Sequence, residues 1–527
     1  MTAAETAPPP EVTVSPFGEL SESAAILILV AVFLAILMGA MDSLVVATVL
    51  TTIAGDLHQT NGVAFVVSAY LVSSTISIPI FSRLSDITSR RNVLVSGLVI
   101  FIAGSALAGL SQNLTELIVF RGVQGFGGGG VFPVAIAMVA VLFPPQTRAR
   151  VTGILSAAAG IAIVLGPLVG SAIVSYTSWR WVFYINLPFG ILALVVLLLE
   201  VGPLTPRTRG RYDLPGTVLL SAWVGALMVA LVQVADAGWA WTNPIVLGLL
   251  ALSAVTVALF LGWELRAPAP LVPLRLLRPR VIGAASGVTL FTGVVFSAYV
   301  TFLSLFVGGV LLHSPNGNSA AVRDIIYFLA IPLVLGAAVA GQLLTKVAYR
   351  ALIAPGLLLA SVAALFLTDF SASTPLWVLS HGFLLVGGLA LPLIPLGFGL
   401  GISLSGVTIA VQNEAPADEV GAAIGLTRFL QSLGGAIGIS LLTVFLTWRS
   451  NQLASSATGP AGVQDAIVTS YNEVFLLLAI CIVIAFVCSL WFVGRMPRSP
   501  EEDPEHVGSE SVAPTAPVRL ADPADPH

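Results

Sequence analysis

Charged residues are scarce in this sequence. Asp, Glu, Lys and Arg make up only 9% of its 527 residues, and Lys346 is the single lysine. Ordinary soluble domains carry about 25% charged residues, and a water-soluble protein of this size would need far more polar surface. Hydrophobic residues make up 57% of the chain. The composition therefore excludes a soluble globular protein and predicts an integral membrane protein.

Other absences exclude several kinds of chemistry. The two cysteines, Cys481 and Cys488, lie in one apolar run, where a helix would place them about 10 Å apart, too far for a disulfide. The five histidines form no Cys/His cluster with metal-ligand spacing. No Walker A sequence occurs, so nucleotide hydrolysis is not expected. The glycines at 125–130 match the dinucleotide-binding pattern GxGxxG, but they lie inside an apolar run, where they favour close helix packing. We expect no enzymatic activity, no metal, no cofactor and, at a net charge of -4, no nucleic-acid partner.

Apolar runs of about 20 residues recur along the chain, and each predicts a transmembrane helix. Fourteen runs are expected, which makes the fold all-α. They cover residues 25–53, 62–82, 92–111, 115–142, 149–174, 181–200, 213–234, 244–264, 282–310, 324–344, 351–369, 376–410, 420–447 and 472–495. An even number of spans places both termini on one side of the membrane.

The distribution of basic residues indicates which side that is. If the N-terminus is cytoplasmic, the cytoplasmic loops contain fourteen Arg and Lys residues and the opposite loops contain three. This excess is the positive-inside pattern, so both termini are expected in the cytoplasm. A composition rich in arginine and poor in lysine is typical of a GC-rich bacterial genome. We therefore expect a multi-pass protein of a bacterial inner (plasma) membrane.

A weak internal repeat predicts how the helices are grouped. Ser82-Arg83-Leu84 and Arg90-Arg91 follow the second span, and Gly341-Gln342-Leu343 and Arg350 follow the tenth at the same spacing, about 260 residues later. This offset predicts two six-helix bundles and a two-helix insert. The expected parts are a disordered tail at 1–23, a first bundle at 24–200, the insert with its linkers at 201–281, a second bundle at 282–495 and a disordered tail at 496–527. Transporters built from repeated bundles bind substrate near the midplane between them.

Four segments carry recognisable motifs. They are Ser82-x-Leu84-Ser85-Asp86-x-x-Ser89-Arg90-Arg91, Leu117-x-x-x-Arg121-x-x-Gln124-Gly125-x-Gly127, Gly166-Pro167-x-x-Gly170-Ser171 with its continuation at 179–190, and Met41-Asp42-Ser43. These segments resemble the signature motifs of the major facilitator superfamily, and together those of its fourteen-helix drug:proton antiporter branch. The resemblance covers the first half well and the second half loosely, mainly through residues 421–438. It implies the major facilitator fold and transport by alternating access.

Asp42 and Arg121 are the candidate proton-coupling residues. The resemblance implies this role for Arg121, and an isolated cation inside an apolar helix costs several kcal/mol, so it needs a partner. Asp42 lies in an apolar span, where desolvation favours the neutral form of a carboxyl group. A proton and a substrate can then compete for the site. The alternatives are an arginine that extends to the outer interface and an aspartate that caps a helix kink.

Two motifs predict conformational switching. Asp86, Arg90 and Arg91 are expected to form contacts at cytoplasmic helix ends that break and re-form as the bundles rock. The alternative is a solvated turn that obeys the positive-inside rule. The Gly166-Pro167-x-x-Gly170 motif is expected to let the fifth span bend where two bundles meet, and the resemblance associates it with antiporters rather than symporters.

Substrate-binding candidates combine polar and aromatic side chains. They are Gln124, Phe296, Tyr299, Phe302, Asp324, Arg428 and Gln431. The three aromatic residues recur at three- and four-residue steps and form a stripe that suits a lipophilic, often cationic ligand, although helix packing explains the stripe as often. Arg428 and Gln431 are expected to line the cavity of the second bundle. Asp324 is a second acidic candidate or, with Arg323, an interfacial ion pair.

The leading hypothesis is a proton-driven exporter of lipophilic or cationic drugs and related small molecules. Its partners would be its substrates, protons and membrane lipids. The proton motive force would supply the energy, and the protein is expected to be a monomer. The alternative is a lipid or glycolipid translocator. The Gly166-Pro167 motif disfavours a symporter, and the cost of idle intramembrane charge disfavours a membrane sensor or scaffold.

Overall fold

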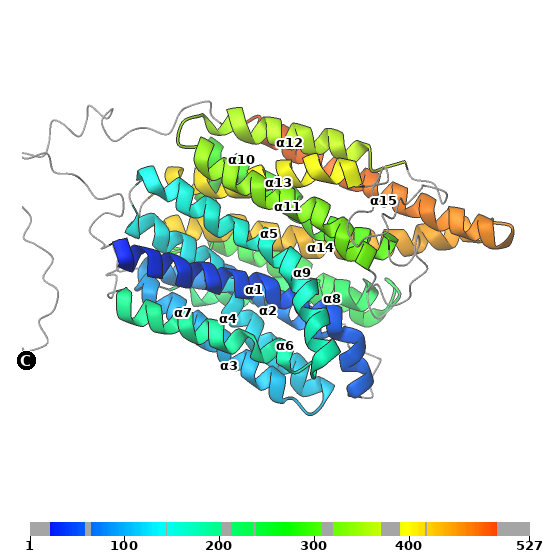
Figure 1. Cartoon of the computed structure of the whole chain (residues 1–527), viewed down its shortest axis with the longest axis horizontal. Helices are drawn as coiled ribbons and strands as arrows, with labels where there is room; N and C mark the ends of the chain where they lie inside the picture. Colours follow the sequence, from blue (N-terminus) through cyan, green and yellow to red (C-terminus); the bar gives the residue numbers. More distant parts are fainter. Residues whose placement is uncertain are drawn as a thin grey trace, which may run out of the picture.

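The computed structural model describes residues 22–57, 65–143, 145–201, 212–235, 239–307, 320–369, 390–416 and 419–492. This part of the chain is helical, as the apolar runs predict, and the helices form one elongated bundle (Figure 1). The expected tails at 1–23 and 496–527 lie almost entirely outside the described residues, which begin at Glu22.

Helices occur in each of the three parts of the chain expected from the repeat. The first half contains α1 (Glu22–Asp56), α2 (Phe65–Ile87), α3 (Arg90–Leu110), α4 (Leu114–Leu142), α5 (Pro145–Tyr176), the single turn α6 (Trp181–Tyr184) and α7 (Asn186–Glu200). The insert contains α8 (Leu214–Ala235) and α9 (Pro244–Glu264), followed by the 3-10 turn η1 (Leu274–Leu277). The second half contains α10 (Arg280–Leu305), α11 (Ala320–Leu343), α12 (Tyr349–Leu365), α13 (Ala390–Glu414), α14 (Val420–Ala454) and α15 (Gly459–Ser489).

Twelve helical segments of the described chain are long and apolar enough to cross a membrane. They are the helices named above without α5 and α12, with α6 and α7 counted together as Trp181–Glu200. The expected number of fourteen is therefore not supported. Helix α12 has 17 residues, fewer than the roughly 20 that span a hydrocarbon core. The expected run at 376–410 begins outside the described residues, and its helix is seen from Ala390 onward.

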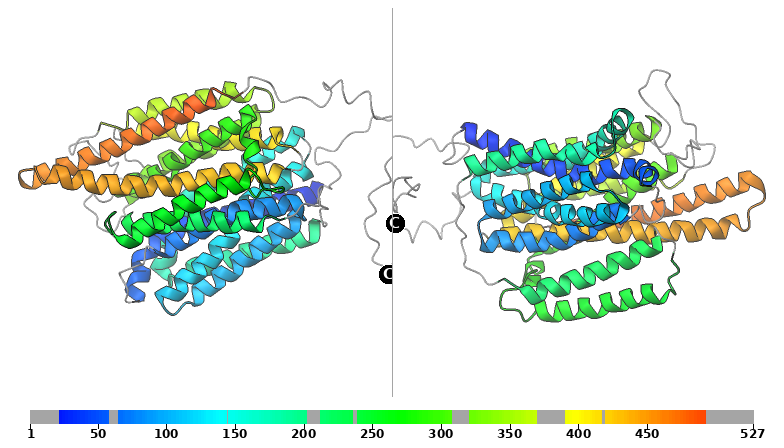
Figure 2. Two further views of the ribbon diagram at one scale, coloured as in Figure 1. Left: turned by 180° about the vertical axis from the view of Figure 1, so that it is seen from behind. Right: turned by 90° about the horizontal axis from the view of Figure 1, so that it is seen from below.

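Helices α1 and α15 define two sides of the bundle. We call the side where α1 begins and α15 ends the terminal side, and the opposite side the far side (Figure 1). With α6 and α7 taken as one span, successive helices run in opposite directions, so α2 ends and α3 begins on the terminal side (Figure 1). On the far side, α14 and α15 extend beyond the other helices as a hairpin (Figures 1 and 2). Arg449 and Glu473 join the two helices of this hairpin through two hydrogen bonds of 2.7 and 2.8 Å.

The two halves contact each other along a seam, and the insert lies outside that seam. Helices α2, α4 and α5 of the first half pack against α11, α13 and α14 of the second. Helix α8 contacts both α2 and α14, whereas its hairpin partner α9 packs on α8 (Figure 2, right). Large apolar side chains such as Leu199, Leu247 and Leu358 remain exposed on the outer faces of the bundle, as expected of surfaces that meet lipid. Polar side chains inside the bundle are therefore the candidates for function.

Candidate functional site

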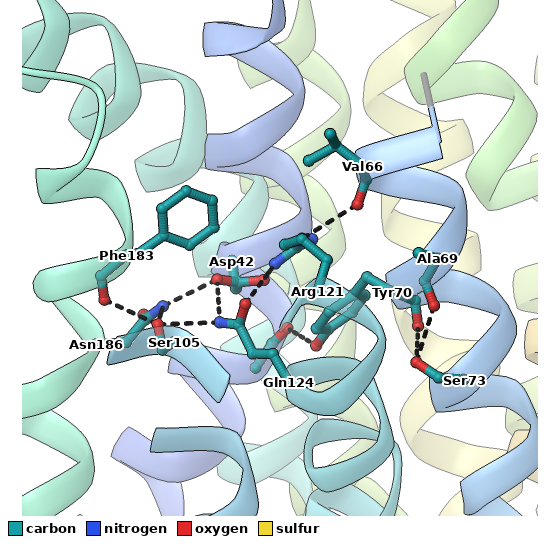
Figure 3. A network of polar contacts seen from close by, with 11 residues as sticks. Asp42, Val66, Ala69, Tyr70, Ser73, Ser105, Arg121, Gln124, Phe183 and Asn186 are labelled. Atoms are coloured by element: carbon teal, nitrogen blue, oxygen red, sulfur yellow. Dashed lines mark hydrogen bonds and ion pairs between the residues drawn. The ribbon is translucent and has the colours of Figure 1, made fainter. Parts of the chain in front are cut away.

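A buried ion pair lies inside the first half. Arg121 of α4 donates through Nη1 to Oδ2 of Asp42 on α1 (Figure 3). The two residues are 0% and 1% exposed, so neither charge reaches solvent. A buried charge without a partner would cost several kcal/mol, and this pairing offsets that cost. The structure thus brings together the two residues that the sequence named as proton-coupling candidates.

Amide donors complete the surroundings of the carboxylate. Oδ1 of Asp42 accepts hydrogen bonds from Gln124 Nε2 at 2.8 Å and from Asn186 Nδ2 at 2.9 Å. Both amide nitrogens also lie 3.1 Å from Oγ of Ser105, which donates to the carbonyl oxygen of Phe183 at 2.8 Å. Four helices therefore supply the network: α1, α3, α4 and α7 (Figure 3). The carboxyl oxygens of Asp42 accept all three of these side-chain hydrogen bonds.

Arg121 has further contacts on its other side. Its Nε donates to the carbonyl oxygen of Val66 at 3.2 Å, and its Nη1 also donates to Gln124 Oε1 at 2.8 Å. The guanidinium lies 4.3 Å from the centre of the Tyr70 ring, a cation–π geometry. Its Nη2 is buried and has no hydrogen-bond partner among the described residues. The arginine is therefore inside the protein, and it keeps one donor for water or for a ligand.

This geometry permits proton exchange at one carboxyl group. A proton that binds Asp42 removes the negative charge that holds Arg121, so the guanidinium would need a new acceptor. Removal of the proton restores the ion pair. Gln124, a predicted substrate-binding residue, has its side-chain amide between Asp42 and Arg121. Its contact with substrate stays a prediction.

Sequence reasoning did not assign a role to Asn186, Ser105 or Tyr70. Asn186 lies in the 179–190 segment, the most distinctive motif of the chain, and that motif was the available signal. Nothing in the local sequence marks Ser105 or Tyr70, since serine and tyrosine are common in apolar helices. Their role depends on how α2 and α3 pack against α4. We predict that Asn186 belongs to the same functional unit as Asp42.

Replacing Asn186 with alanine is expected to lower transport about tenfold without unfolding the protein. The variant removes one of three hydrogen bonds to a buried carboxylate, and a hydrogen bond to a charged group contributes about 1.5–3 kcal/mol. The rate of substrate movement in reconstituted vesicles measures the effect. Asn113→Ala is the matched control, because Asn113 accepts from Glu116 N at 2.9 Å on the exposed end of α4, away from the ion pair. Equal transport by the two variants would contradict the prediction.

A second polar site lies where the halves meet on the terminal side. Asp86, near the end of α2, accepts the backbone N–H of Gly421 through Oδ1 at 2.9 Å and that of Ala422 through Oδ2 at 2.7 Å. These N–H groups begin α14, whose own N-cap residue, Glu419, makes no side-chain cap. A carboxylate at a helix N-terminus satisfies free donors and complements the helix dipole. Asp86 therefore caps a helix of the opposite half.

Neighbouring residues hold this contact in place. Arg90 Nη2 lies 3.2 Å from Asp86 Oδ1, and Arg91 donates to the carbonyl oxygens of Leu197 and Leu198 at 3.2 and 2.8 Å. Arg91 thus joins α3 to the end of α7 instead of joining the two halves. Glu419 forms an ion pair with Arg275 of η1, which ties the linker after the insert to the start of α14.

The close approach of Asp86 requires glycine at the start of α14. A Cβ atom on Gly421 would lie 2.5 Å from Oδ1 of Asp86 and 2.6 Å from Oγ of Ser85. Any side chain at 421 would therefore push the two halves apart at this point. The interpretation of the loop as only a solvated turn is not favoured by this packing, because Asp86 is 4% exposed.

The seam continues inward from this contact. Gln412 of α13 accepts from Thr152 at 2.9 Å and donates to the carbonyl oxygen of Ile136 at 3.0 Å. A Cβ atom on Gly153 of α5 would lie 2.8 Å from the Cα atom of Gly341 on α11, so these two helices touch backbone to backbone. The halves are therefore closely packed on the terminal side of the bundle.

Arg428 and Gln431 face the first half from α14. Nη1 of Arg428 donates to Oε1 of Gln431, and the guanidinium lies 3.4 Å from the centre of the Phe132 ring on α4. The structure therefore brings these two predicted residues together at the seam. Arg428 has no ion pair with an acidic residue in the described part of the chain. Its role in substrate binding stays a prediction.

The aromatic candidates lie in the second half, away from the ion pair. Tyr299 and Phe302 are fully buried inside the second half, where Tyr299 stacks on Phe475 with ring centres 5.8 Å apart, and Phe296 packs beside them, partly buried. This is the helix-packing alternative for the aromatic stripe. Asp324 lies in α11, but its side chain is outside the described residues, as is that of Pro167 in α5. Gly166 and Gly170 are buried in α5, which packs on α1 and α11.

Comparison with known proteins gives the geometry a family context. The family model described as Major Facilitator Superfamily matches residues 31–439. A multidrug transporter protein of Bacillus subtilis is 31% identical over 442 residues, which cover 84% of this chain and 79% of that protein. Multidrug resistance protein 3 of the same organism is 29% identical over 503 residues, which cover 89% of this chain and 95% of that protein.

The fold has solved counterparts as well. The structure of the proton:xylose symporter XylE bound to 6-bromo-6-deoxy-D-glucose superposes with a TM-score of 0.58 and covers 87% of this chain and 95% of that chain. The two sequences are 14% identical, so the likeness concerns the fold alone.

Proposed function

The chain belongs to the Major Facilitator Superfamily of membrane transporters, and from this premise we propose that it exports small lipophilic compounds in exchange for protons. Relatives at about 30% identity that are named as multidrug transport and resistance proteins support this class of substrate. Neither relative specifies the coupling ion, so the coupling to protons is argued from the site itself.

The observation that carries the proposal is the buried Asp42–Arg121 ion pair. A proton that binds Asp42 would release Arg121. A substrate with an acceptor atom could then bind Arg121, and a substrate with a positive charge could compete with the proton for Asp42. Competition between proton and cargo at one carboxylate is the simplest basis for exchange. The available energy is adequate, because one charge crossing 100 mV yields about 2.3 kcal/mol and each pH unit adds about 1.4 kcal/mol.

The Asp86 contact is the proposed gate. A cap made by one half on a helix of the other can be broken and remade as a unit, which is what rocking between two open states requires. We assign the terminal side to the cytoplasm of a bacterial cell, because it carries the excess of arginine. On this assignment, the structure corresponds to a state that is closed toward the cytoplasm.

The fourteen-helix arrangement is also part of the proposal. Helix α5 has 32 residues and α12 has 17, and both lie within the bundle beside recognised spans (Figures 1 and 2). If both cross the membrane, α12 with some local thinning of the bilayer, the total is fourteen. The insert, α8 and α9, would then be an addition to two six-helix halves.

The proposed cargo is a small lipophilic molecule, and the proposed working unit is a monomer with no cofactor. Lipid or glycolipid translocation, the alternative, is not favoured by the relatives described above. Arg428 lies at the seam without an acidic partner in the described chain, so cargo with an aromatic ring or an acceptor oxygen fits this part of the seam better than a compact cation. A cationic substrate would instead bind through the carboxylate of Asp42.

The proposal is tested by reconstitution in vesicles with an imposed pH gradient and ethidium as the probe. We expect ethidium to move against its concentration gradient only while the pH gradient persists, and a protonophore to stop that movement at once. Ethidium movement that is the same with and without the gradient would contradict proton coupling. Transfer of labelled lipid between leaflets without any ethidium movement would favour the alternative.

A further inference from the structure

A groove runs along the outer surface of the second half, between α12 and α15. It is a shallow, open groove with a volume of about 420 Å³, lined by Ala348, Arg350, Ala351, Ala354, Pro355, Leu358 and Phe486. Arg350 lies in the first turn of α12, and Phe486 lies three residues before the end of α15. The groove is therefore on the terminal side, apolar along its length and basic at its end.

The corresponding arginine of the first half is bonded to a neighbouring helix. By the internal repeat, Arg91 at the start of α3 corresponds to Arg350 at the start of α12. Arg91 donates to the carbonyl oxygens of Leu197 and Leu198 at the end of α7. Arg350 makes no such bond to α15, and it has no hydrogen-bond or ion-pair partner among the described residues. Among the described residues, the second half therefore has an unpaired guanidinium beside its groove, whereas the corresponding arginine of the first half is bonded to α7.

The surroundings of Arg350 add positive charge. Lys346 is exposed in the turn just before α12, and Ala348, the residue preceding the helix, provides no side-chain cap for its N-terminal N–H groups. Helix N-termini and basic side chains both favour phosphate. Apolar side chains continue outward from the groove, including Leu358 at 48% exposure, and Trp491 at 71% exposure marks the membrane boundary beyond α15.

We propose that this groove binds one anionic phospholipid of the surrounding membrane. Its phosphate contacts Arg350 and Lys346, and one acyl chain lies against Ala351, Ala354, Leu358 and Phe486. The match is one of charge and shape: basic pockets between transmembrane helices on the terminal side suit anionic headgroups, and the apolar floor suits a chain. A zwitterionic lipid would meet the same floor but gain less at the basic end.

Native mass spectrometry of the purified full chain tests the proposal. Phosphatidylglycerol and phosphatidylcholine with identical acyl chains serve as probes. We expect wild type to retain one phosphatidylglycerol in preference to phosphatidylcholine. Arg350→Ala should weaken that retention about tenfold, because losing a charge-assisted hydrogen bond costs at least the free energy of one decade in affinity. Ala354→Phe, which fills the groove and keeps the arginine, should weaken it as well.

Arg278→Ala is the matched control, because Arg278 is exposed on the same side in the linker before α10 and lies outside the groove. It should retain phosphatidylglycerol as wild type does. Thermal unfolding of each variant without added lipid checks that the fold is intact. Equal retention of the two lipids by wild type, or unchanged retention by Arg350→Ala, would overturn the proposal.

Discussion

Replacing Asp42 with asparagine is expected to reduce proton-driven transport to the level of empty vesicles. Asparagine cannot take up and release a proton, and its single acceptor oxygen cannot serve both Arg121 and the two amide donors that the two carboxylate oxygens now serve. Arg121 would then be a buried cation without a counter-charge, which costs about 3–5 kcal/mol. Transport and thermal stability should therefore both fall in this variant. The vesicle assay with ethidium and a thermal unfolding curve measure the two effects.

A double variant separates the loss of coupling from the loss of stability. Arg121→Gln alone leaves the carboxylate unpaired and should destabilise the protein by a similar amount. Combining Asp42→Asn with Arg121→Gln removes both charges, so no buried charge is left without a partner. The double variant should therefore be more stable than the sum of the two single losses predicts, as is found for residues in direct contact. Transport should stay absent in all three variants. Recovery of proton-driven transport in the double variant would contradict a coupling role for Asp42.

Replacing Asp86 with alanine is expected to open the terminal side of the protein. The variant removes two bonds to the N–H groups that begin α14 and leaves Arg90 without its acidic partner. A helix cap contributes about 0.5–2 kcal/mol, and 2 kcal/mol changes a two-state ratio about 30-fold. Spin labels at Asn92→Cys and Glu414→Cys, with both native cysteines changed to serine, report the distance between the halves. We expect a new population at longer distance.

Asp56→Ala is the control for this experiment. Asp56 accepts from Arg180 at 2.9 Å and from Trp179 at 2.8 Å on the far side of the first half. Like Asp86, Asp56 accepts hydrogen bonds from N–H groups outside its own helix, but it does not lie at the seam between the halves. The label distances should match those of the parent protein. If Asp86→Ala also leaves them unchanged, the assignment of Asp86 to the gate is wrong.

The helices could be predicted from the sequence because bilayer thickness fixes the length of an apolar run. The predicted run at 213–234 and the observed α8, Leu214–Ala235, differ by a single residue at each end. Helix lengths beyond the membrane could not be predicted in this way. Helix α15 begins at Gly459 and not near 472, because a helix in the far-side hairpin is stabilised by its partner and needs no lipid contact.

The sequence was enough to predict which charged residues belong to the candidate site, but not which residues they contact. Asp42 and Arg121 each stood out as a charge inside an apolar run, since such charges are costly unless they have a use. Their pairing joins residues that are 79 positions apart in the sequence, and the Asp86–Gly421 contact joins residues that are 335 positions apart. Local patterns carry no information on such distances. The contacts of Gln124 with both members of the ion pair could not be predicted for the same reason.

Proton release on substrate binding is the most direct test of the central claim, that Asp42 exchanges its proton for cargo. The purified protein is mixed with ethidium in a weakly buffered solution that contains a pH indicator. We predict that wild type releases protons when ethidium is added and that Asp42→Asn, matched for bound detergent and folded fraction, releases none. Equal proton release from the two proteins would show that the exchange takes place elsewhere, and the proposed mechanism would be wrong.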